Sequence, residues 1–386
     1  MLDRDNENMR LGECSFDNDS VDMLYGSVNR LNGSVNSLHG SLNRLYGSVN
    51  ELKKLFGSVH RQFGINRIRS YQTIMFYSNI TRLSDLTFIL LGIPGLERFH
   101  LTFSALMFCM FICTLTGNCI ITLIIMYDQS LHAPMYFLIG MLAFTDLFLS
   151  LTVTPKMMGV FWFHAQEIYF SACVMQMFLV QLLTVMESGI LTAMAMDRYI
   201  AICQPLRYTS ILTGQRIAGI GIIVVMRGVV AVSPCIYLVA RLPFCRNKGI
   251  RQPYCDHMAI ARLACADTTI NSIYGLVFIV LICSIDISCI CFSYIWILKA
   301  VQNLSTKLNQ NKALSTCTSH LCVMSFFYIP GIFSLLAKRL GNNIPDSMDS
   351  ILSTLYILMP PTLNPIVYGV RTKQFRENVK KIVWRK

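Results

Sequence analysis

The sequence predicts an all-α membrane protein built as a bundle of seven transmembrane helices. Its 386 residues are 54% hydrophobic and only 14% charged, and the mean hydropathy is +0.50. A soluble domain carries about 25% charged residues, so this composition excludes an ordinary soluble protein. The apolar residues also gather into seven long runs. Each run can cross the roughly 30 Å of membrane hydrocarbon, which takes about 20 helical residues.

The seven runs carry few formal charges. They are residues 101–127, 134–155, 172–196, 217–240, 268–298, 313–337 and 350–370. The charges within them are Asp146, Glu187, Arg227 and Asp286. A charge inside a membrane is costly unless it is paired or faces the bundle interior, so each of these four positions is expected to be functional or paired. The sequence gives no partner for Arg227 or Asp286.

Basic residues set the expected orientation. The tail after residue 370 carries seven Lys and Arg against Glu377 alone, and the loop after the fifth run carries three lysines and no acid. Such segments stay in the cytoplasm, and seven spans put the termini on opposite sides, so we expect the N-terminus outside. The loop after the fourth run is also basic, but it is long and its cysteines favour an oxidising compartment. The net charge of +12 does not indicate nucleic acid, because the basic residues flank apolar runs.

Three regions are expected: an N-terminal extension at 1–74, the membrane domain at 75–370, and a basic tail at 371–386 with a short amphipathic helix. The extension is of low complexity and repeats every seven residues from Leu24 to Glu51, with apolar spacings of four and three. This spacing is typical of a coiled coil. Each copy also contains Gly-Ser, and a glycine inside a helix costs about 1 kcal/mol. Two interpretations stay open: a weak helix sharpened by self-association and, favoured here, a disordered segment.

A charged string closes the third run. Residues 194–203 read Met-Ala-Met-Asp-Arg-Tyr-Ile-Ala-Ile-Cys, which places Asp197, Arg198 and Tyr199 where a membrane helix meets water. A charged flank that merely stops the helix would explain one arginine, but not the whole string. The string resembles the helix-three signature of rhodopsin-like G-protein-coupled receptors, in the form found in the olfactory branch.

Four more strings resemble olfactory receptors and occur in the family's order. They are Gly117-Asn118, residues 134–138 with Asp146, residues 312–321, and residues 361–368. The resemblance covers residues 75–386, about four-fifths of the chain, and residues 88–97 resemble the entry to helix one in class I, the fish-like subgroup. Met196 departs from the family, which usually has Tyr or Phe there, and the extension before Met75 is absent from the usual pattern.

The resemblance implies a receptor and not an enzyme. An odorant would bind from outside and stabilise the conformation that activates a stimulatory heterotrimeric G protein, which raises cyclic AMP. The implied location is the plasma membrane, among its lipids, in the cilia of olfactory sensory neurons. The implied coupling switch consists of Asp197, Arg198, Tyr199, Asn364, Pro365 and Tyr368. Pro365 interrupts the seventh helix, which predicts a bistable element, with a passive kink as the alternative.

Two other functions stay open from the residues alone. A non-olfactory receptor of the same fold is the nearer one, and expression outside the nose would favour it. A transporter is the other. Transporters often show internal repeats with broken helices in matching positions, and the seven runs show no such symmetry.

Four cysteines fall where the outer loops are expected. They allow three pairings, and the resemblance implies Cys173 with Cys255 and Cys245 with Cys265, which would pin the loop after the fourth helix as a lid over the ligand pocket. Asn79 begins an Asn-Ile-Thr sequon shortly before the first helix, where we expect glycosylation.

Asp146 and Glu187 are expected to meet inside the bundle. In related receptors the helix-two acid helps to hold a sodium ion near the Asn-Pro motif of helix seven. The resemblance therefore implies sodium at Asp146, with Glu187 as a second ligand, and no other cofactor. Two protonated acids bonded to each other are the alternative.

The ligand is expected to be a small carboxylic acid or a similarly polar odorant. The resemblance to acid-recognising class I receptors implies that Arg339, at the outer end of the sixth helix, binds a carboxylate through its planar fork. Gln181 and His257 would complete a polar clamp around the head group of the ligand. Its tail would pack against three apolar side chains, Phe278, Ile279 and Leu335. Snorkelling to the interface is the alternative for basic residues here, and it is preferred for Lys338.

Overall fold

The computed structural model describes residues 86–128, 131–244, 249–302, 307–340 and 345–371. The side chains at 307–309, 311–313, 315–316, 335–340 and 370–371 lie outside this description. By its contacts the chain divides into Met1–Thr81 and Arg82–Lys386, and all described residues belong to the second unit. The N-terminal extension, the tail beyond Arg371 and its expected amphipathic helix therefore lie outside the described residues.

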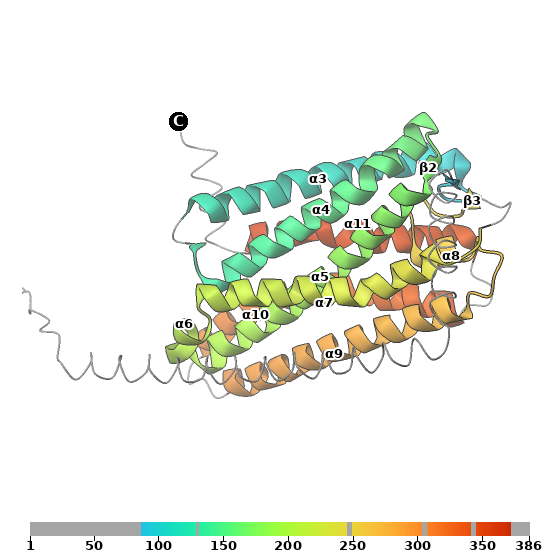
Figure 1. The fold of residues 1–386 in the computed structure, drawn as a ribbon. Coiled ribbons are helices and arrows are strands. Elements are labelled where there is room, and N and C mark those ends of the chain that lie inside the picture. The colour runs from blue at the N-terminus through green and yellow to red at the C-terminus, as the bar shows by residue number, and fades with distance from the viewer. Residues whose placement is uncertain (1–85, 129–130, 245–248, 303–306, 341–344, 372–386) are drawn as a thin grey trace, which may run out of the picture. The chain divides into compact units, whose positions relative to one another are not determined.

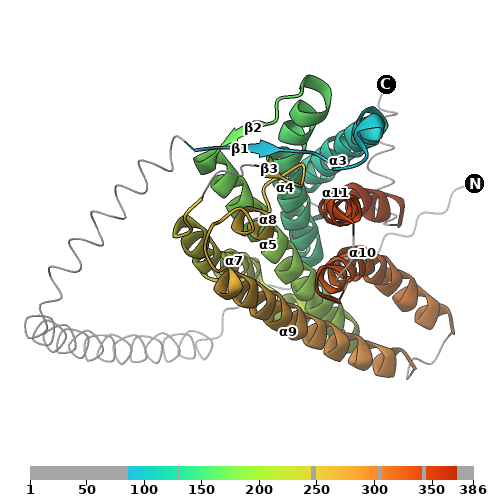
Figure 2. The ribbon, with the colours of Figure 1, turned by 90° about the vertical axis from the view of Figure 1, so that its right-hand side faces the viewer.

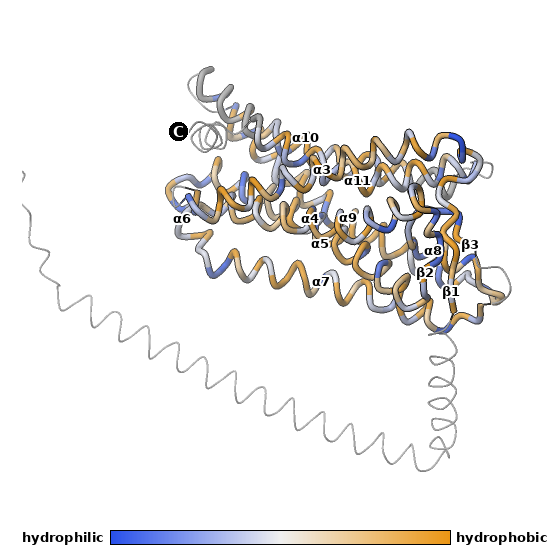
Figure 3. The backbone as a smooth tube through the Cα atoms, turned by 90° about the horizontal axis from the view of Figure 1, so that it is seen from above, coloured by the Kyte–Doolittle hydropathy of each residue, from blue (hydrophilic) through white to orange (hydrophobic). Residues whose placement is uncertain are grey.

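Seven helices in the described ranges are long and apolar enough to span a membrane, which confirms the predicted fold class. Figures 1 and 3 show them side by side along a common direction, with hydrophobic residues over most of their length. They are α3 (His100–Tyr127), α4 (Pro134–Phe163), α5 (Phe170–Cys203), α7 (Gly214–Ala240), α9 (Thr269–Gln302), α10 (Lys307–Leu340) and α11 (Asp346–Arg371).

Several helices run beyond the apolar runs that predict them. α5 continues past residue 196 to Cys203, so the Asp-Arg-Tyr string is helical. α4 continues through Pro155 and Lys156 to Phe163. It accommodates that lysine because the Lys156 ammonium donates to the carbonyls of Ala165 and Glu167, at 2.7 and 2.6 Å. Helix ends therefore follow local hydrogen bonding and not only the loss of apolar residues.

A small sheet covers one end of the bundle. β1 (Thr87–Leu90) pairs antiparallel with β2 (Glu167–Tyr169) and parallel with β3 (Gly249–Ile250), in the order β2-β1-β3. Figure 2 looks onto this end, where the short helix α8 (His257–Ala261) lies beside the strands. Phe88 and Leu90 of β1 are fully buried. We call this the sheet end; the sequence did not predict it.

The opposite end carries two short helices after α5. They are η3 (Pro205–Arg207) and α6 (Tyr208–Ile211), which precede the start of α7. Thr213 caps α7 by accepting the backbone N–H of Arg216. We call this the α6 end (Figure 1). A further short helix, η1 (Glu97–Phe99), leads into α3 at the sheet end.

α5 is the central helix of the bundle. It packs against α4, α7, α9 and α10. Ile190, Leu191, Met194 and Ala195 of α5 are fully buried in the core cluster nearer the α6 end. Because α5 touches four neighbours, its polar side chains can reach partners on several helices.

Candidate functional site

The Asp-Arg-Tyr string forms a closed ion pair at the α6 end. The Arg198 guanidinium lies 2.9 Å from Asp197 Oδ2, and the Tyr208 hydroxyl donates to Asp197 Oδ1 at 2.8 Å. Asp197 is 1% exposed, whereas the Arg198 side chain is 16% exposed. Burial, and next the neighbouring Asp197, raise the pKa of Tyr208, so this hydroxyl stays a donor at neutral pH. Asp197 therefore holds both Arg198 and the α6 segment.

Side chains from α9, α10 and α11 lie around Arg198, and among these helices only α11 carries predicted switch residues. Tyr294 of α9 and His320 of α10 lie close enough to interact electrostatically with Arg198. The His320 ring is 5.6 Å from that of Tyr368 on α11, and the Tyr368 hydroxyl contacts Met194 Sδ at 3.9 Å. Tyr199 instead packs on Phe292 of α9, with ring centroids 6.2 Å apart. The structure thus gathers most of the predicted switch residues around one helix end.

Buried carboxylates meet the Asn-Pro motif in the middle of the bundle. Asn364 donates to Asp146 Oδ2 at 2.9 Å, and Glu187 lies close enough to both side chains to interact with them. Each of the three is at most 1% exposed. Within the described part of the chain, Asp146 Oδ1, Glu187 Oε1 and Asn364 Oδ1 have no hydrogen-bond partner. Buried acceptors without donors suit either a cation or an added proton, so the residues fit the implied sodium ion.

The first and seventh helices touch where their motifs meet. Asn118 donates to the carbonyl of Pro361 at 3.0 Å and so satisfies a backbone group near the prolines of α11. A Cβ at Gly117 would lie 2.7 Å from Pro365 Cβ, closer than such atoms can approach. The Gly117-Asn118 motif therefore exists because Pro365 packs directly on α3.

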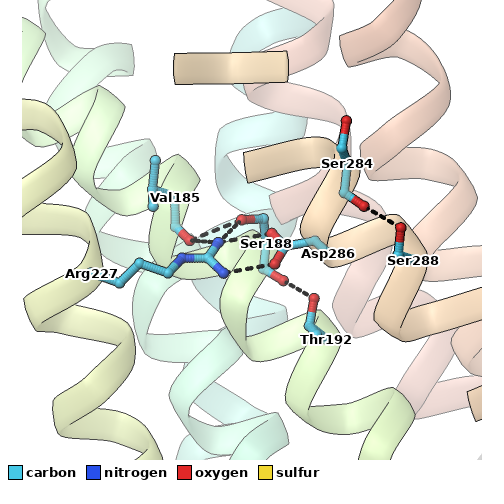
Figure 4. A network of polar contacts seen from close by, with 7 residues as sticks. All are labelled: Val185, Ser188, Thr192, Arg227, Ser284, Asp286 and Ser288. Carbon is cyan, nitrogen blue, oxygen red and sulfur yellow. Dashed lines mark hydrogen bonds and ion pairs between the residues drawn. The ribbon is translucent and has the colours of Figure 1, made fainter. Parts of the chain in front are cut away.

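A second ion pair joins three helices, and the sequence predicted no partner for either charge. Arg227 of α7 donates to both oxygens of Asp286 on α9, at 2.7 and 2.8 Å (Figure 4). It also donates to Ser188 Oγ on α5 at 2.7 Å and to the Val185 carbonyl at 3.3 Å. Bidentate contact between a guanidinium and a carboxylate is a strong geometry. Gly189 lies beside this pair and lets α7 pack closely on α5, since a Cβ there would lie 3.1 Å from Val224 Cγ2.

The sheet end is held by a disulfide and by polar clamps. Cys173 and Cys255 are bonded, as the resemblance implied. Gln176 secures the same place: it donates to the Thr152 carbonyl and accepts from the backbone N–H of Cys255, at 2.9 and 3.0 Å. Arg251 forms an ion pair with Asp346 at the start of α11. The loop after α7 is therefore fastened to α5 and α11, and Gln176 and Arg251 are residues that the sequence analysis missed.

The second predicted disulfide lies partly outside the described residues. Cys265 is disulfide-bonded, whereas Cys245 is not described. Their neighbours Phe244 and Ala264 form a β-bridge, and the Cys265 backbone N–H donates to Pro243 at 2.9 Å. This backbone geometry is compatible with a Cys245–Cys265 bond. Asn79 also lies outside the described residues.

The predicted ligand residues are only partly described. His257, at the start of α8, is 4% exposed and lies against Gly275 of α9, one turn from Phe278. His257 Nε2 and Gln181 Oε1 of α5 are buried and have no hydrogen-bond partner among the described residues. Ile279 is 38% exposed. The side chains of Leu335 and Arg339 in α10 lie outside the described residues.

Comparison with known proteins identifies the family. A sequence model described as "Olfactory receptor" matches residues 107–386. The human olfactory receptor 52J3 is 47% identical over 79% of this chain and 98% of its own length. Human olfactory receptors 52N2 and 52D1 are 47% and 48% identical, over 79% and 77% of this chain and 95% and 94% of their own.

The chain belongs to the olfactory receptor family. It is a multi-pass membrane protein and an odorant receptor of the G-protein-coupled type, not an enzyme. Squid rhodopsin has the same fold, with a TM-score of 0.61 over 75% of this chain and 81% of that one, at 19% identity. The contacts described above therefore join the family motifs of this olfactory receptor, which lie on helix one (α3), helix three (α5) and helix seven (α11).

Proposed function

We propose that this olfactory receptor binds a small odorant beneath the loop at the sheet end and activates a stimulatory heterotrimeric G protein at the α6 end, which raises cyclic AMP. The observation that carries the proposal is the Asp197–Arg198 pair. Arg198 keeps its charge and is held by the adjacent Asp197 at a helix end. A rearrangement of the helices can therefore break this ion pair while the helices stay folded. α5, which runs about 50 Å between the two ends, connects them.

The proposed odorant is a small carboxylic acid, and the proposed subgroup is class I. Gln181 Oε1 and His257 Nε2 support a polar ligand, because buried polar atoms without partners are rare in native structures. Arg339 near the end of α10 would bind the carboxylate, while Phe278, Ile279 and Leu335 contact the tail. The disulfide and the Gln176 clamp support the lid, since they fix the backbone of Cys255 next to His257.

The proposed orientation places the α6 end in the cytoplasm and the N-terminus outside. The basic residues after α9 and α11 support this orientation. Asn79 would then be glycosylated, Cys245 and Cys265 would be bonded in the oxidising compartment, and the receptor would serve in the cilia of olfactory neurons. Sodium held by Asp146 and Glu187 would stabilise the arrangement with the Arg198 pair closed.

Cyclic-AMP dose–response curves for a carboxylic acid and its methyl ester test this proposal. Charge-assisted hydrogen bonds are worth about 1.5–3 kcal/mol, so Arg339→Ala should weaken the acid by about tenfold to a hundredfold. Lys338→Ala, one residue away, is the matched control and should change little. Equal potency of acid and ester on the wild type, or equal loss in both variants, would rule out the carboxylate contact. Uptake of the odorant without cyclic AMP would favour a transporter instead.

A further inference from the structure

A cavity of about 310 Å³ lies between α5 and α7. Apolar side chains form most of its wall, and its polar lining residues are Thr192, Asp197 and Arg227. Each of these three already makes hydrogen bonds within the protein. Asp197 and Arg227 are also paired with opposite charges. The cavity therefore offers no unpaired charge, and the occupant that suits it is a hydrocarbon.

The cavity opens to the outside of the bundle, where the bilayer would lie. Ile223 of α7 and Met196 of α5 line it, and they are 67% and 36% exposed. Water is disfavoured in an apolar cavity, and an empty cavity leaves the side chains around it without packing partners. Hydrocarbon from the bilayer can fill this space without either cost.

The length and depth of the cavity match one leaflet of the membrane. Along α7 the lining runs from Ile217 to Arg227, which is ten residues or about 15 Å. Ile217 lies three residues from the start of α7, and Arg227 stands at its middle. Half of the hydrocarbon core is also about 15 Å thick. The cavity thus runs from the membrane surface at the α6 end to the midplane, which is the path of a lipid acyl chain.

Met196 accounts for the open space in this particular chain. It lines the cavity, at a position where the family usually has Tyr or Phe. A rigid aromatic ring there would take up part of the cavity, whereas the unbranched and flexible methionine leaves it open. The cavity is therefore expected to be smaller in relatives that keep the aromatic residue.

We propose that this cavity is a binding site for one acyl chain of a membrane phospholipid from the leaflet at the α6 end. The chain enters beside Ile217, packs between Ala193 of α5 and Ile220 of α7, and ends near Arg227. Asp197 belongs to the same wall, so the bound chain lies beside the coupling switch.

Photolabelling of the full-length receptor in phosphatidylcholine vesicles tests the proposal. The probe is a phosphatidylcholine with a diazirine in the middle of one acyl chain, and mass spectrometry maps the labelled residues. Ile222 of α7 is the internal reference, because it is 65% exposed and does not line the cavity. Ala193 and Ile220 are half-buried, yet we expect them to be labelled at least as strongly as Ile222. Labelling that merely follows exposure would overturn the site.

The position of the diazirine tests the direction of the chain. A label near the ester should react at Ile217, and a label at the methyl end should react at Val224, which lines the deeper part of the cavity. A pattern that is reversed, or that is the same for both probes, would contradict a chain anchored at the α6 end.

Variants of Met196 test occupancy of the cavity. Met196→Phe should reduce labelling of Ala193 and Ile220 by about tenfold or more, because the ring and the chain would overpack the same space. Met196→Leu keeps the volume and should preserve labelling. Met226→Phe is the matched control, since Met226 is 54% exposed on α7 but does not line the cavity.

Equal labelling in Met196→Phe and Met226→Phe would overturn the proposal, and so would equal losses in Met196→Phe and Met196→Leu. The labelling of Ile222 should stay constant in all three variants, which confirms that each one is folded in the bilayer. Because the readout is binding, a failed cyclic-AMP response would not affect the result.

Discussion

Among the described residues, two ion pairs with a buried aspartate are built in opposite ways. Asp197 and Arg198 are adjacent on α5, and both arginines are partly exposed, Arg198 at 16% and Arg227 at 29%. Arg227 and Asp286 are 59 residues apart on different helices, joined by two parallel contacts. The first pair can open by a side-chain rotation. The second is held more firmly, because a rotation of Arg227 would break its four hydrogen bonds to Asp286, Ser188 and Val185 together. The difference indicates that the first pair suits a switch and the second a fixed joint.

The largest effect is expected from breaking the fixed joint. Asp286→Ala leaves the Arg227 charge uncompensated inside the bundle, which should cost about 3–5 kcal/mol of folding free energy. Thermal unfolding of the purified receptor, together with surface expression, measures the loss. The double variant Arg227→Leu with Asp286→Leu is the control, because removing both charges is often nearly neutral. A double variant no more stable than the single one would contradict the assignment.

Arg198→Ala should affect signalling and largely spare stability. Asp197 would keep its hydrogen bond from Tyr208, so α6 stays in place. We expect odorant-stimulated cyclic AMP to be lost at near-normal surface expression. Arg216→Ala is the matched control, because Arg216 lies at the same end but binds only backbone carbonyls of Ser210 and Ile211 among the described residues. Normal signalling from a well-expressed Arg198→Ala variant would sink the switch role.

A smaller effect is expected from Tyr208→Phe. Tyr208 stabilises the ionised form of Asp197, so its loss favours protonation of Asp197 and release of Arg198. Basal cyclic AMP without odorant should rise, at most by about tenfold to a hundredfold, since a hydrogen bond to a charged group is worth about 1.5–3 kcal/mol. Asp197→Asn should raise it further. Unchanged basal activity in both variants would mean that the pair does not restrain the receptor.

The sequence could predict the helices because each one carries its own signal. A charge-free run such as 101–127 predicts a span without reference to any other part of the chain. The sheet could not be predicted in this way, because β3 has two residues and pairs with a strand far away in sequence. A short strand with distant partners leaves no periodic pattern.

The two ion pairs differ in the same way in how far the sequence could predict them. Asp197 and Arg198 are adjacent, so their motif already contains their contact. Arg227 and Asp286 each stood out as a costly charge, but nothing in the chain between them shows that α7 and α9 are neighbours along α5. Each of the two apolar runs carries a single charge, and the two charges have opposite signs. Pairing Arg227 with Asp286 would therefore have been a sound hypothesis from the sequence.

His257 sharpens the comparison, because it is a buried titratable group that stays neutral instead of forming an ion pair. Burial lowers its pKa, and the nearby Asp256 only partly opposes this. The folded state therefore binds its proton less readily than the unfolded state. By linkage, stability is full above the unfolded pKa of about 6.5 and declines as the pH falls below it. The decline ends once the pH drops below the lowered pKa of the folded state.

Thermal unfolding measured between about pH 7.5 and pH 5 tests this dependence. The wild-type receptor should lose stability over this range, and His257→Gln should lose less, because glutamine has no proton to gain. His164→Asn is the control for the loss of an exposed histidine, and asparagine tolerates the left-handed φ of 52° at this position. If the stability of His257→Gln and that of the wild type decline in parallel as the pH falls, protonation of His257 is not the cause of the loss.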